Sequence, residues 1–261
     1  MGLPFFFIVA KLTAMHTNIT VVILAAGLGT RMKSNKAKVL HKICGKPMIN
    51  YVAETARKVA GNNVVLVIGN QADRVRRTVS ELGPFSFAYQ RKQLGTGHAV
   101  LCALPHIPDG CRDVVVLCGD VPLIKADTVN ALVSSHVSEK RDVSVLAVEL
   151  KNPTGYGRIL LNESGKVKAI VEESDATAEQ KRIRLINTGI FCVRKNFLFG
   201  ALPRIQSNNA KGEIYLTDIV EIAYRENRHV GVTVGDNYLE VTGINTIQEL
   251  ERVERAMKNP T

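Results

Sequence analysis

The chain has 261 residues, of which 46% are hydrophobic and 22% charged, and its formal net charge is +10. This balance is typical of a globular protein with enough apolar sequence for one large core. Its longest basic cluster, Arg74, Arg76 and Arg77, is interrupted, so we interpret it as a solvated helix face and expect no nucleic-acid or membrane partner.

The N-terminus begins with an apolar run, LPFFFIVA, at 3–10. It is too short to span a bilayer, and it lacks the basic leader and the cleavage site of a signal peptide. Met15 stands just before the first recognisable element. We therefore expect 1–18 to be a disordered extension, with Met15 as the natural start and Met1–Ala14 as an upstream-start addition. N-terminal sequencing of the native protein tests this, and a start at Met1 would contradict it.

The first half of the chain alternates short apolar runs with amphipathic stretches. Strands are predicted at 19–24, 64–68, 114–118 and 143–150, and helices at 47–59, 71–82, 97–104 and 125–137. This βαβ alternation predicts an α/β fold with a doubly wound, mostly parallel, Rossmann-like sheet. Ligands of such sheets bind outside the carboxyl ends of the strands.

The second half is more mixed. Strands are predicted at 155–161, 166–172, 184–193, 230–234 and 238–241, and helices at 213–226 and 246–257. No Pro/Gly/Ser-rich linker and no internal repeat divides the chain. We expect one nucleotidyltransferase domain over 19–261, whose second half adds a smaller antiparallel lid on the substrate side.

The five cysteines are odd in number and include no CxxC pair, which predicts free thiols and a cytoplasmic location. A disulfide framework and a zinc site are both disfavoured by this spacing. The cysteines are Cys44, Cys102, Cys111, Cys118 and Cys192.

The first predicted strand runs into a Gly-rich loop, LAAGLGTR, at 24–31. Small residues let backbone N–H groups approach phosphate oxygens closely. The loop is not a Walker motif, and Met32 replaces the third glycine of the dinucleotide fingerprint. By itself the Gly-x-Gly pattern is equally typical of a simple tight turn between a strand and a helix. Arg31 and Lys38, which follow it, favour phosphate binding. Their charges suit a triphosphate and a departing pyrophosphate.

The segment LAAGLGTRMKSNKAKVLHKICGKPMI, at 24–49, resembles the start of bacterial sugar nucleotidyltransferases. Four later motifs narrow the resemblance: QRKQLGTGHA at 90–99, NPTGYGRI at 152–159, INTGI at 186–190 and EIYLTDI at 213–219. From residue 19 onward the chain is similar to the uridyltransferase half of the bacterial bifunctional N-acetylglucosamine-1-phosphate uridyltransferase/glucosamine-1-phosphate acetyltransferase. The resemblance implies joining UTP to N-acetylglucosamine-1-phosphate, with release of pyrophosphate and Mg²⁺ as cofactor.

For the nucleotide, the amide of Gln90 offers a donor and an acceptor to a base edge, although alone it is better read as a surface glutamine. The resemblance implies that Gln90 binds uracil as part of a set of loop residues. That substrate-binding set is Leu24, Ala25, Ala26, Gly27, Gln90, Gly95, Thr96 and Gly119.

For the metal, Asp120 follows the predicted strand at 114–118. A carboxylate there is costly unless it is paired or metal-bound, but a helix N-cap is an equally good interpretation from the residue alone. The resemblance implies that Asp120 and Asn245 bind Mg²⁺ and that Arg31 and Lys38 are catalytic. The sugar phosphate would attack the α-phosphorus in line, so the reaction needs positioning and charge neutralisation and no protein nucleophile.

For the sugar, Gly157, Glu172 and Asn187 match the family positions that contact N-acetylglucosamine. Asn245 completes the substrate-binding set. Alone, Glu172 would be an exposed strand carboxylate and Asn187 a turn former. Five histidines have no Ser, Cys or carboxylate partner at a spacing typical of a catalytic site, and we interpret them as structural or surface residues: His41, His98, His106, His136 and His229.

The chain departs from the family pattern in three ways. It carries no hexapeptide-repeat β-helix, so we expect no acetyltransferase activity and no trimer formed through that helix, and monomer and dimer both stay open. Ser174 stands where a lysine is usual, which leaves the sugar specificity open. Ala37 stands where a proline is usual, which predicts a looser loop around Lys38.

Three alternatives remain on the sequence. The first is a uridyltransferase for another sugar-1-phosphate, or an enzyme for another nucleotide. The second is a non-catalytic nucleotide-sugar sensor, which the presence of Arg31, Lys38, Asp120 and Asn245 disfavours. The third is an RNA-binding module, supported only by the net charge and recognisable by salt-sensitive binding without turnover.

Overall fold

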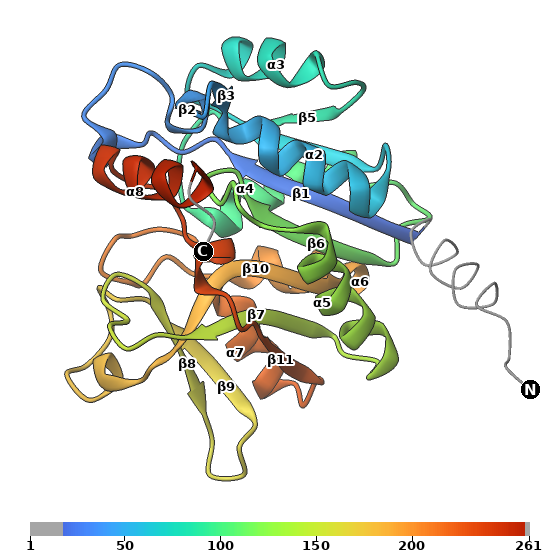
Figure 1. The fold of residues 1–261 in the computed structure, drawn as a ribbon. Helices are drawn as coiled ribbons and strands as arrows, with labels where there is room; N and C mark the ends of the chain where they lie inside the picture. The colour runs from blue at the N-terminus through green and yellow to red at the C-terminus, as the bar shows by residue number, and fades with distance from the viewer. Residues whose placement is uncertain (1–17, 259–261) are drawn as a thin grey trace, which may run out of the picture.

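A nine-stranded sheet forms the centre of the molecule, and the computed structural model describes residues 18–258 (Figure 1). The main path of the sheet runs β11-β7-β10-β6-β1-β4-β5. Its strands are β1 (Ile19–Ala25), β4 (Val64–Ile68), β5 (Ser86–Tyr89), β6 (Asp113–Cys118), β7 (Val143–Glu149), β10 (Leu185–Arg194) and β11 (Val230–Val234). Only β10 runs against the others, because it pairs antiparallel with both β6 and β7. The predicted mostly parallel α/β sheet is therefore confirmed.

The sheet is covered by helices on both faces. The helices are α2 (Met48–Ala60), α3 (Ala72–Ser80), α4 (Thr96–Ala103), α5 (Ala126–Ser138), α6 (Lys195–Ala201), α7 (Asp218–Arg225) and α8 (Ile247–Lys258). Alternate residues of β1 point to opposite faces: Val21 and Ile23 pack with α2, α3 and α5, while Val22 packs with α4, α6 and α7. Because both faces are buried, the central strands are near-continuous runs of Val, Ile and Leu.

A β-hairpin formed by β8 (Gly157–Leu161) and β9 (Val167–Val171) extends from one end of the sheet (Figure 1). It joins the sheet where Arg158 and Gly157 of β8 pair with Ile186 and Asn187 of β10. In the second half of the chain the antiparallel pairings are those of the hairpin and of β10, whereas β11 pairs parallel with β7. A separate two-stranded sheet consists of β2 (Lys42–Ile43) and β3 (Lys46–Pro47).

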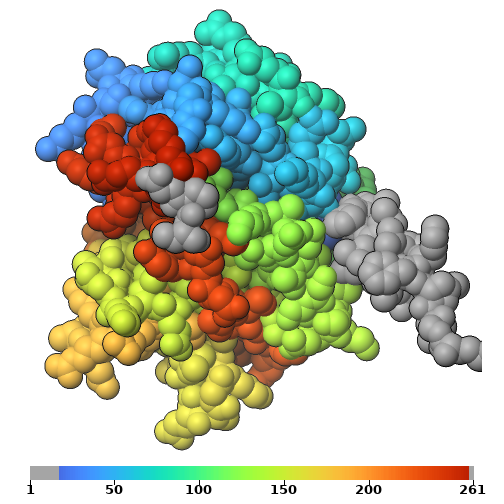
Figure 2. Space-filling view, viewed as in Figure 1, coloured from blue at the N-terminus to red at the C-terminus, as the bar shows by residue number. Residues whose placement is uncertain are grey.

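The C-terminal helix α8 packs against the segment that follows the Gly-rich loop, and Figure 2 shows the two in contact at the surface. Leu250 and Val253 of α8 bury against Met32, Ile43 and Met48. This small core ties the end of the chain to the loop after β1.

Two predicted elements differ from the structure. The helix predicted over 213–226 begins only at Asp218, because Ile214 N donates to Leu94 O at 2.7 Å and Gly97 N donates to Ile214 O at 2.8 Å. These bonds hold 213–217 against the Gly-rich turn in a non-helical conformation. The strand predicted over 238–241 is a 3-10 helix, Tyr238–Val241, capped by the side chain of Asn237.

Other predictions about the surface are confirmed or lie outside the described residues. Arg74, Arg76 and Arg77 are exposed on α3, as the solvated-face interpretation expects. All five cysteines are free thiols. The extension predicted over 1–18, and with it the choice of start, lies outside the described residues except for Asn18. No helix within 18–258 is long and apolar enough to cross a bilayer.

Candidate functional site

A cavity of about 440 Å³ opens at the carboxyl ends of β1, β5 and β6. Three loops line it, at 24–30, 90–96 and 118–120, together with Lys38 from the segment after the first loop. The parallel strands place these loops at one edge of the sheet. All eight predicted nucleotide-binding residues lie on these three loops, and all but Gly119 line the cavity.

The Gly-rich loop is shaped by one glycine and one lysine. Gly29 has φ 66°, and a Cβ there would lie 2.6 Å from the Cβ of Lys38, so a larger residue would displace the lysine. Gly27 is exposed, and a Cβ there would meet no atom within 4 Å. The loop therefore leaves backbone open beside the cavity, as phosphate binding requires.

The four predicted catalytic and metal-binding residues come together although they are far apart in sequence. Lys38 Nζ lies 2.5 Å from Asp120 Oδ2 and donates to Asn245 Oδ1 at 3.1 Å. Arg31 Nη2 donates to the same Asn245 oxygen at 2.8 Å. Two oxygens and two cations thus form one cluster beside this cavity.

This donor set fits a magnesium ion. Asp120 and Asn245 both contact the same ammonium group, so their oxygens are close enough to share one cation. Within 18–258 no group of three or more His, Cys, Asp or Glu side chains could hold a metal. A site with one carboxylate and one amide oxygen suits Mg²⁺, which keeps several waters and takes further ligands from substrate phosphates.

Asn245 is positioned by the start of α8. Glu249 Oε2 accepts from Asn245 N at 2.7 Å and from Thr246 N at 3.0 Å, and Thr246 Oγ1 accepts from Glu249 N at 3.2 Å. This reciprocal arrangement is a capping box, which fixes the direction of the chain at the helix start. Sequence reasoning missed Glu249, although the spacing of Thr246 and Glu249 was a usable signal.

The loop at 90–96 is rigidly held around Gln90, which is only 4% exposed. Gln90 Nε2 donates to Gly95 O at 3.0 Å and lies 3.1 Å from His98 Nδ1. Gly95 has φ 110°, and a Cβ there would lie 2.4 Å from Ile214 O. Only glycine fits at this point. His98, for which the sequence predicts only a structural or surface role, contacts a predicted base-binding residue.

A second cavity of about 190 Å³ adjoins the first and shares Leu24, Thr96 and Cys118 with it. It is lined by the predicted sugar-binding residues Gly157, Glu172 and Asn187, which come from β8, the end of β9 and β10. The structure therefore brings together all three.

Polar contacts orient two side chains that line this second cavity. Thr217 Oγ1 donates to Glu172 Oε1 at 3.2 Å, and Asn187 Oδ1 accepts from Gly189 N at 3.0 Å. Burial raises the pKa of Glu172 above its usual range, although the Thr217 hydroxyl opposes the shift. Sequence reasoning missed Thr217, because nothing in the EIYLTDI motif alone marks its hydroxyl as facing the cavity.

Cys118 lies between the two cavities. Burial raises the pKa of its thiol to about 12, so the group is neutral near pH 7. A neutral thiol is a poor nucleophile. This agrees with a direct displacement that requires no covalent intermediate.

The two departures near the site behave differently. Ser174 is exposed, and its Oγ donates to Asp175 Oδ2 at 2.9 Å, so no cation is supplied there. Ala37 has φ −53°, within the range that proline adopts. The loop around Lys38 therefore keeps a proline-compatible backbone without the proline.

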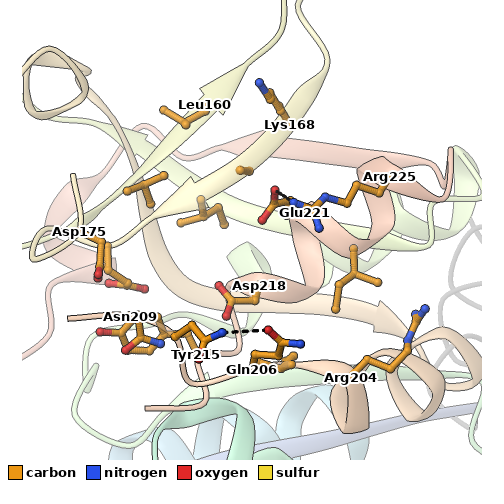
Figure 3. Close-up of a pocket in the computed structure, with 17 residues that line it drawn as sticks. Leu160, Lys168, Asp175, Arg204, Gln206, Asn209, Tyr215, Asp218, Glu221 and Arg225 are labelled. Carbon is orange, nitrogen blue, oxygen red and sulfur yellow. Dashed lines mark hydrogen bonds and ion pairs between the residues drawn. The ribbon is translucent and has the colours of Figure 1, made fainter. Parts of the chain in front are cut away.

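A larger cavity of about 580 Å³ lies between β9 and α7, and Figure 3 shows its lining. It shares Glu172 with the second cavity. Burial, with the nearby charges of Glu221, Glu172 and Asp175, raises the pKa of Asp218 there to about 6. The cavity places several carboxylates behind the predicted sugar-binding residue.

Comparison with known proteins agrees with this architecture. The model of the family described as "MobA-like NTP transferase domain" matches residues 21–183. A solved structure titled as UDP-glucose pyrophosphorylase complexed with UDP-glucose has a TM-score of 0.74 at 19% identity and covers 93% of this chain and 98% of that one. At that identity the likeness shows the fold alone.

Sequence relatives are closer. "Bifunctional protein GlmU" of Caldanaerobacter subterraneus subsp. tengcongensis is 45% identical over 91% of this chain and 51% of its own length. GlmU of Caldicellulosiruptor saccharolyticus is 46% identical over 94% and 53%, and that of Desulfotalea psychrophila 40% identical over 92% and 70%. The chain spans about half the length of most of the curated relatives it matches. It belongs to the MobA-like NTP transferase family, and the resemblance to the uridyltransferase half of the bifunctional proteins is confirmed.

Proposed function

We propose that the chain is a sugar-phosphate uridyltransferase that makes UDP-N-acetylglucosamine and pyrophosphate from UTP and N-acetylglucosamine-1-phosphate. The observation that carries the proposal is the cluster of Arg31, Lys38, Asp120 and Asn245 beside the nucleotide cavity. The similarity to the bifunctional GlmU proteins supports the sugar nucleotide, as does the second cavity with Glu172 and Asn187, which we take as the sugar cavity. The five free thiols support a cytoplasmic location as part of the same proposal.

Nucleotidyltransferases generally use a divalent metal, and we propose Mg²⁺ held by Asp120 and Asn245. When bound, the ion would neutralise phosphate charge and stabilise the in-line displacement. The chain's own residues supply the rest. The exposed backbone around Gly27 receives the phosphates, and Gln90 receives the base. Arg31 and Lys38 oppose the negative charge that develops as pyrophosphate leaves.

The two cavities explain how the reactants meet. They share Leu24, Thr96 and Cys118, so a sugar phosphate bound against Glu172 and a nucleotide bound along the Gly-rich loop would be neighbours. Holding two reactants in line replaces a bimolecular encounter with a positioned one. Glu172 and Asn187 would hydrogen-bond the sugar, and such a pocket rejects analogues that lack the matching groups.

A second candidate is a uridyltransferase for a different sugar-1-phosphate, because Ser174 supplies no cation beside the sugar cavity. Pyrophosphate release with UTP and Mg²⁺ should therefore be measured across N-acetylglucosamine, glucosamine, glucose and N-acetylgalactosamine 1-phosphates. We expect N-acetylglucosamine-1-phosphate to dominate. A preference for another sugar would favour the second candidate, and no turnover by a folded protein that binds UTP would favour a sensor.

The same assay tests the phosphate cluster. Lys38→Ala should lower kcat by roughly 100-fold or more, the scale of losing one electrostatic donor to a transition state. Lys36→Ala is the matched control, since Lys36 lies in the same loop and its side chain makes no hydrogen bond or ion pair within the described residues. Equal rates for the two variants would place the phosphate-binding cations elsewhere.

A further inference from the structure

We propose that His98 is a positioning residue that fixes the amide of Gln90 so that only its carbonyl oxygen is offered to the base, which selects uracil over cytosine. This inference rests on the proposed function, because it takes the cavity beside Gln90 as the place of the base. It concerns the choice among nucleotides, which the phosphate cluster does not address.

The orientation of the Gln90 amide follows from its two neighbours. Nε2 lies 3.0 Å from Gly95 O, and a carbonyl oxygen can only accept, so the nitrogen of the amide must face it. The same nitrogen lies 3.1 Å from His98 Nδ1. An amide nitrogen carries two N–H groups, so these two acceptors use both of them.

The state of His98 is set by the same contact. Because the amide donates, Nδ1 must be the unprotonated nitrogen and Nε2 carries the hydrogen. Nε2 lies 3.9 Å from Cys102 Sγ, one turn further along α4, where it can donate weakly to sulfur. Burial raises the pKa of the Cys102 thiol, which keeps the sulfur neutral. Helix α4 thus carries a chain of two contacts that ends at Gln90.

The carbonyl oxygen of Gln90 is what remains for a ligand. Oε1 makes no hydrogen bond with the described residues, and it is absent from the buried polar atoms that lack a partner, so it keeps some accessible surface on a residue that lines the cavity. Gln90 itself is 4% exposed, which leaves it little freedom to turn. The site therefore offers a fixed acceptor.

A fixed acceptor distinguishes the two pyrimidines at one ring position. N3 of uracil carries a hydrogen and can donate to Oε1, whereas N3 of cytosine carries a lone pair and would face the oxygen unfavourably. Leaving buried polar atoms without a partner is more costly than losing an average hydrogen bond. Without His98 a single hydrogen bond to Gly95 O, in place of two acceptors, would hold the amide, so its nitrogen could turn toward the base more readily.

The test compares His98→Ala with His98→Asn, because the Asn Oδ1 occupies nearly the place of Nδ1 and can still accept. The measurement is kcat/KM for UTP and for CTP with N-acetylglucosamine-1-phosphate. We expect His98→Ala to reduce the UTP/CTP preference by about 10- to 100-fold, chiefly through KM for UTP. His98→Asn should retain most of the preference. An equal loss with both nucleotides, leaving the ratio unchanged in His98→Ala, would overturn the inference.

Two further measurements keep the inference testable if a variant folds poorly or if the proposed function is wrong. If His98→Ala folds poorly, the ratio of UTP to CTP dissociation constants in His98→Asn and in His98→Gln is measured by calorimetry. The longer Gln side chain should not restore the acceptor, so equal ratios for the two variants would also overturn the inference. A wild-type protein that binds UTP but makes no product with any sugar phosphate would refute the proposed function, and the binding ratio would still test the role of His98.

Discussion

Asp113 begins strand β6 and Asp120 lies two residues beyond its end, and the two aspartates have different surroundings. Asp113 is completely buried. Arg112 Nε donates to its Oδ2 at 2.8 Å, and the side chains of Arg194 and His136 lie 3.3 and 3.4 Å from Oδ1. Asp120 follows the other end, with 18% of its side chain exposed, and contacts Lys38 beside the proposed nucleotide cavity.

The difference shows that solvent access, more than residue type, decides whether an aspartate here has a structural role or is available to a ligand. His136 bridges Asp113 and Ser144, with 2.9 Å between Nδ1 and the serine Oγ. The arrangement has the residue types of a hydrolase triad, but all three side chains are buried without a route for a substrate. The carboxyl edge of a parallel sheet is left open by its loops, and Asp120 lies there.

The largest expected effect is on catalysis, and it comes from replacing Asp120 at the open, carboxyl end of β6. Asp120→Ala removes the only carboxylate of the proposed metal site, so pyrophosphate release should fall by about 1,000-fold or more. Because Asp120 is partly exposed, the melting temperature should stay within about 2 °C of wild type. Near-normal turnover in a folded variant would remove Asp120 from the metal site.

The second prediction concerns stability, and it comes from replacing Asp113 at the buried, amino end of β6. Asp113→Ala removes a completely buried acceptor and leaves the buried His136 ring and the partly exposed Arg112 and Arg194 side chains without it, so it should lower the free energy of unfolding by about 1–3 kcal/mol. Asp109→Ala is the control, since Asp109 is fully exposed and should change stability little. Urea unfolding measures both. Equal stability of the two variants would mean that the network around Asp113 is not important for folding.

The pH dependence of Asp113→Ala gives a further check. Burial alone would raise the pKa of Asp113, but its contacts with His136 and Arg112 outweigh burial and hold the pKa below its ordinary value. A lowered pKa in the folded state contributes stability above the unfolded pKa, near 3.9, and the contribution is lost as pH falls through the folded value. The difference from wild type should therefore shrink in acid.

The third prediction concerns a half-buried carboxylate without such partners. No ion pair or hydrogen bond from the described residues reaches the carboxylate of Asp218, and burial, with its acidic neighbours, raises its pKa to about 6. A raised pKa stabilises the fold below the unfolded value, and this contribution is lost as pH rises through about 6. Asp218→Asn should thus be more stable than wild type at pH 8 by about 1–2 kcal/mol.

Chemical unfolding of wild type and Asp218→Asn tests the direction of this stability difference. It should be measured from about pH 4, near the ordinary pKa of an aspartate, to about pH 8, well above the raised pKa of about 6. The advantage of the variant should diminish toward pH 4. A variant that is less stable at pH 8 would mean that the carboxylate is stabilising, for example through its place at the start of α7.

The smallest effect concerns the loop that carries Lys38. Ala37 already has φ −53°, so Ala37→Pro should fit without strain. It should raise the free energy of unfolding by about 0.4–1 kcal/mol by restricting the unfolded chain. A melting curve measures this, and a loss of stability would indicate that the backbone before Lys38 cannot accept proline.

Much of the fold was predictable because its signals are local. The buried strand at 64–68 has the predicted bounds, since a run of Val, Leu and Ile between polar turns is unambiguous. The segment 213–217 was not predictable as non-helical. Its helical pattern is overridden by backbone bonds to Leu94 and Gly97, more than 100 residues away. Tertiary contacts of this kind leave no periodic trace in sequence.

The residues of the candidate site also divide into those that local sequence predicts and those that only tertiary packing brings into place. Arg31 and Lys38 follow a recognisable loop, and Asp120 follows a recognisable strand, so they could be proposed from sequence. Asn245 is brought to them by the packing of α8, and only the family resemblance pointed to it. The contact between His98 and Gln90 depends on how one loop folds onto α4, and no spacing rule revealed it.

The most direct test of the account is a crystal structure with UDP-N-acetylglucosamine and Mn²⁺, read by anomalous scattering. We expect the metal peak between Asp120 and Asn245, the uracil against Gln90 and the sugar against Glu172 and Asn187. A metal peak away from Asp120, or a sugar outside the cavity that contains Glu172, would contradict the assignment of this edge of the sheet as the active site.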